Sequence, residues 1–133
     1  MKIIRRKAKV IKIGSVCIGG NFAVAIQSMT KTETSDIEKT SAQIKQLKQA
    51  GCDIVRLAVK DEQDARAIKK IKARAGLPIV CDIHFNWKLA LEAIDNGADK
   101  IRLNPGNIYK KEQIKEIARR AKLNHIPIRV GVN

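Results

Sequence analysis

The stretch GADKIRL at residues 97–103 repeats GCDIVRL at residues 51–57, and this repeat decides the fold class. Both copies follow the pattern G-x-D-x-(V/I)-R-L, in which a helix-ending glycine precedes a short apolar run typical of a buried strand. Two strand-helix units separate the copies. Alternate strands of a (β/α)8 barrel contribute side chains to the same interior layer, so we expect Arg56 and Arg102 to share one layer.

Outward from the repeat, short apolar runs alternate with helical patterns. The runs predict strands over residues 23–26, 53–59, 78–83, 99–103 and 127–132. A regular strand-helix alternation implies right-handed crossovers and a parallel sheet with helices packed against it. We therefore predict an α/β fold of the TIM-barrel type. A doubly wound sheet is the alternative, but no G-x-G-x-x-G turn follows the first predicted strand.

Residues 1–20 predict a hairpin, because alternating apolar residues are broken by Gly14-Ser15 and end at Gly19-Gly20. We expect residues 23–133 to form an incomplete barrel. Helix boundaries are marked by capping patterns and glycines. The four helices are predicted over 35–51 with a Ser35/Glu38 capping box, over 61–76 from Asp61 to Gly76, over 86–97 from Asn86, and around Ile114, Ile117, Ala118 and Ala121 up to Asn124.

Composition limits the function class. The chain has 133 residues with 27 Lys and Arg against 13 Asp and Glu, a net charge of +14, and 44% hydrophobic residues, which suits one globular domain. No apolar run is long enough for a membrane span or a signal peptide, so we expect a cytoplasmic protein without a membrane partner. The basic residues are scattered and only 1 Trp, 1 Tyr and 2 Phe are present, so we expect no nucleic-acid partner.

The three cysteines, Cys17, Cys52 and Cys81, lie far apart and form no C-x-x-C pair. This spacing predicts neither a disulfide framework nor a zinc site. We interpret the cysteines as small buried hydrophobic residues. No residue of the chain is assigned as a catalytic group or as a metal ligand.

Polar residues recur at alternate positions near the ends of the predicted strands. They are Arg56; Asp82 and His84; Lys100, Arg102 and Asn104; and Arg129 and Asn133. Period two places each set on one face of its strand, and guanidinium groups bind phosphate oxygens in a bidentate way. The pattern predicts a site for a small, multiply charged anion such as a diphosphate. The alternative is an internal layer of ion pairs in which Asp82 balances the arginines.

Four further positions carry both a functional and a structural interpretation. Gln27 and Ser28, at the end of the first predicted strand, either contact a substrate or cap the strand. His84 either takes part in proton transfer or oxygen binding, or is a packed imidazole that a carboxylate such as Asp82 orients. Asn104 begins the turn Asn104-Pro105-Gly106-Asn107, whose amides bind either a ligand or their own backbone. His125 precedes the fifth predicted strand, and we expect it on the opposite rim with a structural role.

Six segments together resemble the 4-hydroxy-3-methylbut-2-enyl diphosphate synthase family. They occur in the family's order across nearly the whole chain. The segments are IGG (18–20), QSMT (27–30), AGCDIVR (50–56), DIHF (82–85), KIRLNPGN (100–107) and IRVGVN (128–133).

The resemblance implies an oxidoreductase of non-mevalonate isoprenoid biosynthesis, whose barrel holds the substrate diphosphate. Such enzymes reductively open and dehydrate 2-C-methyl-D-erythritol 2,4-cyclodiphosphate. Two electrons come from flavodoxin or ferredoxin through a [4Fe-4S] cluster, whose ligands lie in a separate C-terminal domain, and the full-length protein is a homodimer. Carried onto matching positions, Arg56, Arg102 and Arg129 resemble diphosphate ligands, with His84, Asn104 and Asn133 lining the site.

A complete barrel takes about 250 residues. Residues 1–133 therefore correspond to an N-terminal portion of the barrel domain, without three strands and without the iron–sulfur domain, and we expect this fragment to be inactive alone. Its open strand edges favour aggregation or pairing with another chain. Two alternatives stay open, another phosphate-ester barrel of the dihydropteroate-synthase type and a non-catalytic module that binds polyanions.

Overall fold

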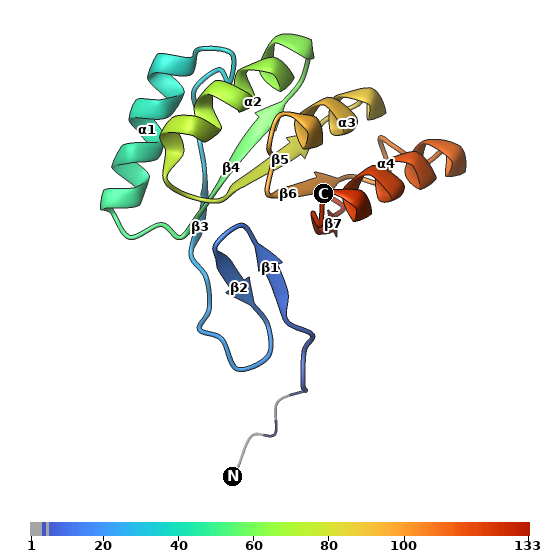
Figure 1. The fold of residues 1–133 in the computed structure, drawn as a ribbon, viewed down its shortest axis with the longest axis horizontal. Coiled ribbons are helices and arrows are strands. Elements are labelled where there is room, and N and C mark those ends of the chain that lie inside the picture. Colours follow the sequence, from blue (N-terminus) through green and yellow to red (C-terminus); the bar gives the residue numbers. More distant parts are fainter. Residues whose placement is uncertain (1–3, 5) are drawn as a thin grey trace.

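The alternation of strands and helices predicted from the apolar pattern is present in the computed structural model, which describes residue 4 and residues 6–133 (Figure 1). The strands are β1 (Ile11–Ile13), β2 (Val16–Ile18), β3 (Gln27–Met29), β4 (Ile54–Val59), β5 (Ile79–Ile83), β6 (Lys100–Leu103) and β7 (Ile128–Val130), and the helices are α1 (Ile37–Gln49), α2 (Glu62–Ala75), α3 (Trp87–Asp95) and α4 (Lys111–Leu123).

Five strands form one parallel sheet in the order β3-β4-β5-β6-β7, with each strand beside its neighbour in the sequence. This order is that of consecutive barrel strands, whereas a doubly wound sheet reverses its order at a switch point. The predicted fold class, α/β with part of a TIM-type barrel, is confirmed. Within the described chain, β3 and β7 are the two edges of this sheet.

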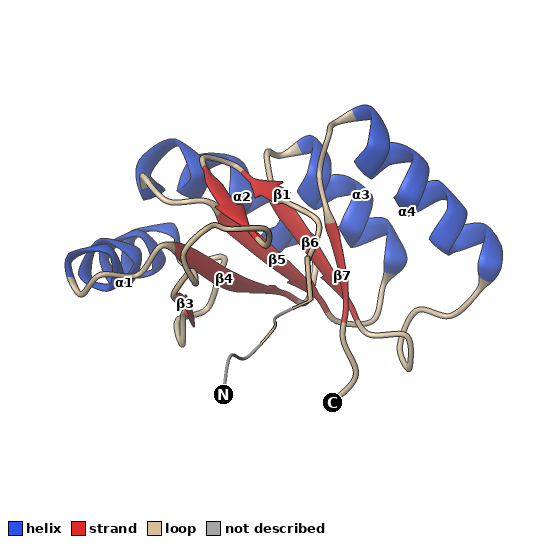
Figure 2. Cartoon of the chain, turned by 90° about the horizontal axis from the view of Figure 1, so that it is seen from below, coloured by secondary structure: helices blue, strands red, loops and turns tan. Residues whose placement is uncertain are grey.

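The two faces of the sheet are covered differently. All four helices lie along one face (Figure 2), where they pack on alternate strand residues that include Leu57, Cys81 and Ile101, all fully buried. The other face, called the helix-free face below, presents the intervening residues. The predicted hairpin, β1 antiparallel to β2, covers the end of this face where the strands begin, because Ile13 packs against Ile54 and Val80. The part of the hairpin prediction that concerns residues 1–3 and 5 lies outside the described residues.

The aspartates of the G-x-D repeat tie neighbouring strand ends together. Asp53 Oδ2 accepts the backbone N–H of Ile26 at 2.8 Å, and the N–H of Asp53 donates to the carbonyl of Ile26 at 2.8 Å. Asp99 makes the same pair of bonds to Ile79, at 2.7 and 2.9 Å. The repeat therefore encodes a two-bond clamp between one strand end and the strand before it, and we call these the aspartate clamps.

The prediction of a strand over residues 23–26 is wrong, since the first sheet strand is Gln27–Met29. Strand β4 starts at Ile54, which pairs with Gln27, and the clamp from Asp53 already occupies the backbone of Ile26. Residues 23–26 precede this pairing, and Val24 is 89% exposed. Apolar content alone did not locate the paired residues.

The capping box predicted for Ser35 and Glu38 is also wrong. The cap of α1 is Asp36, whose Oδ1 accepts the N–H of Lys39 at 3.1 Å. The N–H of Ser35 instead donates to Asp64 Oδ1 at 2.9 Å, and Glu38 pairs with an arginine of α2. The helix therefore starts one residue later than a Ser35 cap would place it.

Other helix ends agree with the sequence. Asp61 caps α2 by accepting the N–H of Asp64, and Asn86 caps α3 by accepting the N–H of Lys88. Gly76 ends α2 in the left-handed conformation with φ +60°. Within the part of the chain that the structure describes, no helix combines the length and the apolar composition that crossing a bilayer requires.

Candidate functional site

The helix-free face carries a three-residue network built on three neighbouring strands. Asp82 on β5 lies between Arg56 on β4 and Arg102 on β6. Its Oδ2 accepts from Arg56 Nε at 3.1 Å and from Arg56 Nη2, and its Oδ1 accepts from Arg102 Nη1 at 3.1 Å. The Asp82 side chain is 4% exposed, Arg102 11% and Arg56 24%. The sequence predicted this shared location for the two arginines.

The register explains how the two arginines reach one carboxylate. Arg102 stands directly opposite Asp82, whereas Arg56 pairs with Val80 and is offset from Asp82 by two residues along the strand. Apart from the apolar Val80, these positions carry charged side chains. The period of two residues along each strand places them on the helix-free face. Such a network agrees in part with the alternative prediction of an internal ion-pair layer.

Two more cations lie on the same face without a carboxylate partner among the described residues. Lys100 precedes Arg102 by two residues and is 9% exposed, and Arg129 stands opposite Arg102 in the register with an exposed side chain. Burial lowers the pKa of Lys100, and the nearby charge of Arg129 lowers it further. Asp82 alone does not balance these cations, so the described part of this face carries an excess of positive charge.

Asn133 extends this network, because its Oδ1 accepts from Arg102 Nη2 at 3.1 Å. Arg102 thus divides its guanidinium between Asp82 and Asn133. The two hydrogen bonds hold the plane of the guanidinium in one orientation, so that its remaining N–H groups have fixed directions toward a ligand.

The turn after β6 supports the mouth of the site. Asn104 is buried, and its Oδ1 accepts the N–H of Gly106 at 2.9 Å, so this oxygen serves the turn itself. Asn107 Nδ2 donates to the carbonyl of His84 at 2.9 Å and links the ends of β5 and β6. The half-buried His84 ring lies edge-on to Phe85, with ring centres 6.4 Å apart. The contacts of Asn104 and Asn107 match the structural interpretation of the turn.

Gln27 and Ser28 do not share a face. Gln27 lines a cavity of about 410 Å³ between the hairpin and the helix-free face, together with Lys100 and Arg129. Ser28 pairs in register with Val55, whose side chain belongs to the core under the helices. Ser28 therefore alternates toward the helices, away from the arginines.

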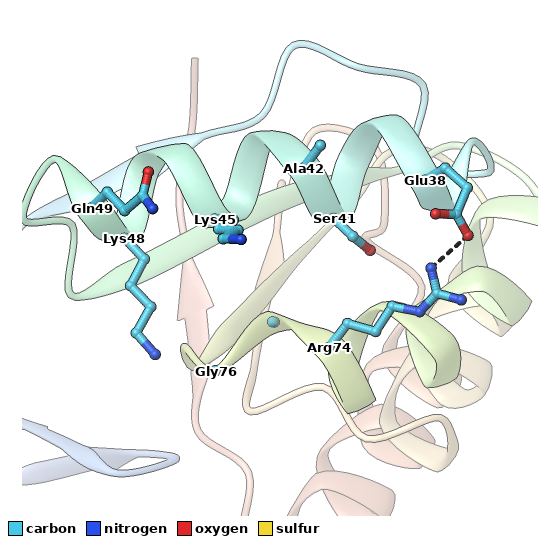
Figure 3. Close-up of a pocket in the computed structure, with 9 residues that line it drawn as sticks. Glu38, Ser41, Ala42, Lys45, Lys48, Gln49, Arg74 and Gly76 are labelled. Carbon is cyan, nitrogen blue, oxygen red and sulfur yellow. Dashed lines mark hydrogen bonds and ion pairs between the residues drawn. The ribbon is translucent and has the colours of Figure 1, made fainter.

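Another groove lies elsewhere, between α1 and α2 (Figure 3), with a volume of about 730 Å³. Its charged side chains serve the two helices. Arg74 Nη1 pairs with Glu38 Oε1 at 2.5 Å, and Lys48 lies over Gly76 at the end of α2, where a lysine offsets the helix dipole. This groove is formed by helix packing and lies on the opposite side of the sheet from the arginines.

The cysteines do not come together. Cys81 lies in the helix-covered core, the Cys52 Sγ donates to the carbonyl of Ile54 at 2.9 Å, and Cys17 is half-buried in the hairpin. Within residues 4 and 6–133, no three His, Cys, Asp or Glu side chains form a group that suits a metal ion. The described residues therefore do not fit a [4Fe-4S] cluster.

The position of His125 agrees with the prediction. It has a positive φ of 55° after α4 and lines a groove with residues that precede β6, at the end of the sheet opposite the arginine network. The sequence pattern places Lys100 on the alternating face but does not mark it as a ligand. Its burial next to Arg129 is the signal that only the structure supplies.

Comparison with known proteins gives a family match. The model of the GcpE TIM-barrel domain matches residues 8–133. The chain is 54% identical over 130 residues to the 4-hydroxy-3-methylbut-2-en-1-yl diphosphate synthase (flavodoxin) of Caldanaerobacter subterraneus subsp. tengcongensis, covering 98% of this chain and 37% of that protein. It is 60% identical over 125 residues to the synthase of the same name from Caldicellulosiruptor saccharolyticus, covering 94% and 36%.

Among solved structures, the chain resembles a phospho-2-dehydro-3-deoxyheptonate aldolase from Thermotoga maritima, with a TM-score of 0.66 and 17% identity over 93% of this chain and 37% of that one. At this identity the likeness concerns the fold alone. The chain spans little more than a third of the length of the synthases that it matches.

Proposed function

This chain belongs to the GcpE TIM-barrel domain family, and from that premise we propose that it is the diphosphate-binding part of a 4-hydroxy-3-methylbut-2-en-1-yl diphosphate synthase. The observation that carries the proposal is the excess of cations on the helix-free face. Arg56, Arg102, Arg129 and Lys100 share this face with a single carboxylate, Asp82, in the described chain. A small, multiply charged anion supplies the missing negative charge.

In the complete enzyme, the proposed reaction is the reductive opening and dehydration of 2-C-methyl-D-erythritol 2,4-cyclodiphosphate. The chain's own contribution is to bind and orient the diphosphate through the guanidinium groups, beside His84 and the turn that starts at Asn104. A [4Fe-4S] cluster would supply the two electrons. Since the described residues do not fit such a cluster, we propose that its ligands belong to another part of the enzyme and that this fragment alone is inactive.

Flavodoxin stands in the names of the matched relatives, and we propose it as the electron donor of the complete enzyme. The homodimer and the cytoplasmic location stay predictions from the sequence. The family match favours the synthase over a barrel of the dihydropteroate-synthase type.

A polyanion-binding module is the second candidate, because Asp82 already engages both Arg56 and Arg102. In that case binding follows net charge alone. Affinity for DNA and for a diphosphate would then be similar and would fall steeply with added salt.

The test is a calorimetric titration of the chain with inorganic diphosphate, with the cyclodiphosphate and with a DNA duplex at two salt concentrations. The matched variants are Arg129→Ala on the helix-free face and Arg119→Ala on the outer surface of α4, where Arg119 pairs with Glu116. We expect both diphosphates to bind more tightly than DNA, and only Arg129→Ala to weaken them. Equal loss in the two variants would contradict a shaped site.

A further inference from the structure

One carboxylate on the helix-free face carries the same sign of charge as the anion that this face is proposed to bind. Asp82 is nearly fully buried and contributes a negative charge directly beside two arginines that are proposed to receive an anion. In a site selected only for anion affinity, this carboxylate would lower the affinity. Its presence therefore needs a reason in the geometry of the arginines.

We infer that Asp82 is a positioning residue, which fixes the guanidinium groups of Arg56 and Arg102 so that the site selects a diphosphate over compact anions such as sulfate. This inference rests on the proposed function, since it concerns how the same site discriminates among anions.

The hydrogen bonds show which donors Asp82 takes and which it leaves. Arg56 gives Nε and Nη2 to Asp82, so its Nη1 makes no hydrogen bond to another described residue. Arg102 gives one N–H of Nη1 to Asp82 and one N–H of Nη2 to Asn133, so Nε is its nitrogen without a described partner. Each guanidinium is thus held in its plane by other groups, and its remaining N–H groups have fixed directions.

The strand that carries Asp82 suits this role. β5 is the middle strand of the five-stranded sheet, and all five of its residues are buried. Asp82 has a short side chain on this rigid strand, so both of its oxygens have fixed positions between β4 and β6. The separation between the free donors of Arg56 and Arg102 is therefore set by the sheet, and we expect it to suit an anion with two phosphoryl groups better than a compact anion.

The inference is testable because the two possible roles of Asp82 predict opposite changes in anion affinity. Asp82→Asn keeps the shape of the side chain and removes one negative charge. If Asp82 is only a counter-ion, the variant binds every anion more tightly. If Asp82 positions the arginines, the amide cannot accept hydrogen bonds on both sides, the guanidinium groups lose their orientation, and diphosphate affinity falls although the face has become more positive.

The experiment is calorimetric titration of wild type, Asp82→Asn and Asp95→Asn with inorganic diphosphate and with sulfate. Asp95 is the matched control, since it pairs with Arg120 between α3 and α4, away from the site. We expect Asp82→Asn to bind diphosphate at least fivefold more weakly and to lose its preference over sulfate, with no change in Asp95→Asn. Diphosphate binding that is equal or tighter in Asp82→Asn would overturn the inference.

A measurement on the wild type covers the case in which the variant does not fold. Nitrogen-15 NMR of arginine Nε–H groups should show slow hydrogen exchange for Arg56, and this protection should persist after diphosphate is added. Fast exchange, or release of the Arg56 Nε–H by diphosphate, would refute the positioning role. Absence of any diphosphate binding to the wild type would instead reject the proposed function, while the exchange rate of the free protein would still test the hydrogen bond.

Discussion

Gly131 lies against Arg102. A Cβ atom on Gly131 would stand 3.2 Å from Arg102 Nε and 3.8 Å from Arg129 Nε, while the N–H of Gly131 donates to the carbonyl of Leu103 at 3.0 Å. The backbone of Gly131 is not left-handed. Glycine at this position therefore leaves space for the side chains of Arg102 and Arg129 and is not required by the backbone conformation.

Gly131→Ala should weaken diphosphate binding several-fold and leave stability within about 0.5 kcal/mol of the wild type. The added methyl group presses on the Nε edge of Arg102 that is free to bind an anion, whereas the backbone accepts alanine without strain. Calorimetric titration and urea unfolding measure the two quantities. Gly51→Ala is the contrasting variant, because Gly51 has φ +93° with open space around it, so it should lose stability and keep binding. Unchanged diphosphate affinity in Gly131→Ala would contradict the contact.

Asp99→Ala should destabilise the chain by about 1–3 kcal/mol, because it leaves the buried N–H of Ile79 without its charged acceptor. Asp99 is the deeper aspartate clamp and also pairs with Lys72. Asp53→Ala should cost less, since its N–H partner Ile26 is 61% exposed whereas Ile79 is fully buried. Urea unfolding of both variants measures the difference. Asp95→Ala, which removes a surface ion pair, is the control and should change stability by less than about 0.5 kcal/mol; an equal loss there would reject the clamp.

Lys100→Met should stabilise the chain at neutral pH by on the order of 1 kcal/mol, because it removes a buried charge without a described carboxylate partner. Burial lowers the pKa of Lys100, so the charged form is penalised in the folded state. The penalty is fully present below the lowered pKa and disappears as the pH rises past the ordinary value of 10.5. The stability gap between variant and wild type should therefore narrow in urea unfolding from pH 8 to pH 11. A gap that is constant over this range would exclude titration of Lys100 as its cause.

Iodoacetamide should label Cys17 in the native chain and leave Cys81 unlabelled. Burial raises the pKa of the Cys81 thiol far above its ordinary value, and the charges of Asp99 and Asp82 raise it further. The reactive thiolate is therefore absent at neutral pH, and access is blocked as well. Cys17 is only half-buried in the hairpin. Peptide mass spectrometry after labelling at pH 8 reads out both sites, with the urea-unfolded chain as the fully labelled reference; native labelling of Cys81 before Cys17 would count against the core position.

The main elements of the fold could be predicted because their signals are local. Gly76, Asp61 and Asn86 mark helix ends by their own backbone or side-chain chemistry, and the structure agrees. The two errors arose where a distant side chain decided the outcome. Asp53 fixes where β3 can pair, and Asp64 takes the N–H of Ser35, so that Asp36 becomes the cap.

The candidate site shows the same difference between local features, which the sequence predicts, and contacts between distant residues, which it does not. Strand parity predicted that Arg56, Asp82 and Arg102 share a face, since period two depends only on the sequence. Parity did not show that Asp82 contacts both arginines, nor that Lys100 is buried beside Arg129, because these facts depend on the register between strands. The prediction that Ser28 and Gln27 belong to one site does not agree with the structure. Neighbouring residues of a strand face opposite sides of the sheet.

The aspartate clamps have a direction along the chain. Asp53 bonds to a residue 27 positions before it, and Asp99 to one 20 positions before it. When each aspartate leaves the ribosome, its partner strand has already been synthesised. The clamps thus suit vectorial assembly, in which every new strand docks on the sheet already made and the growing edge advances in the order of translation.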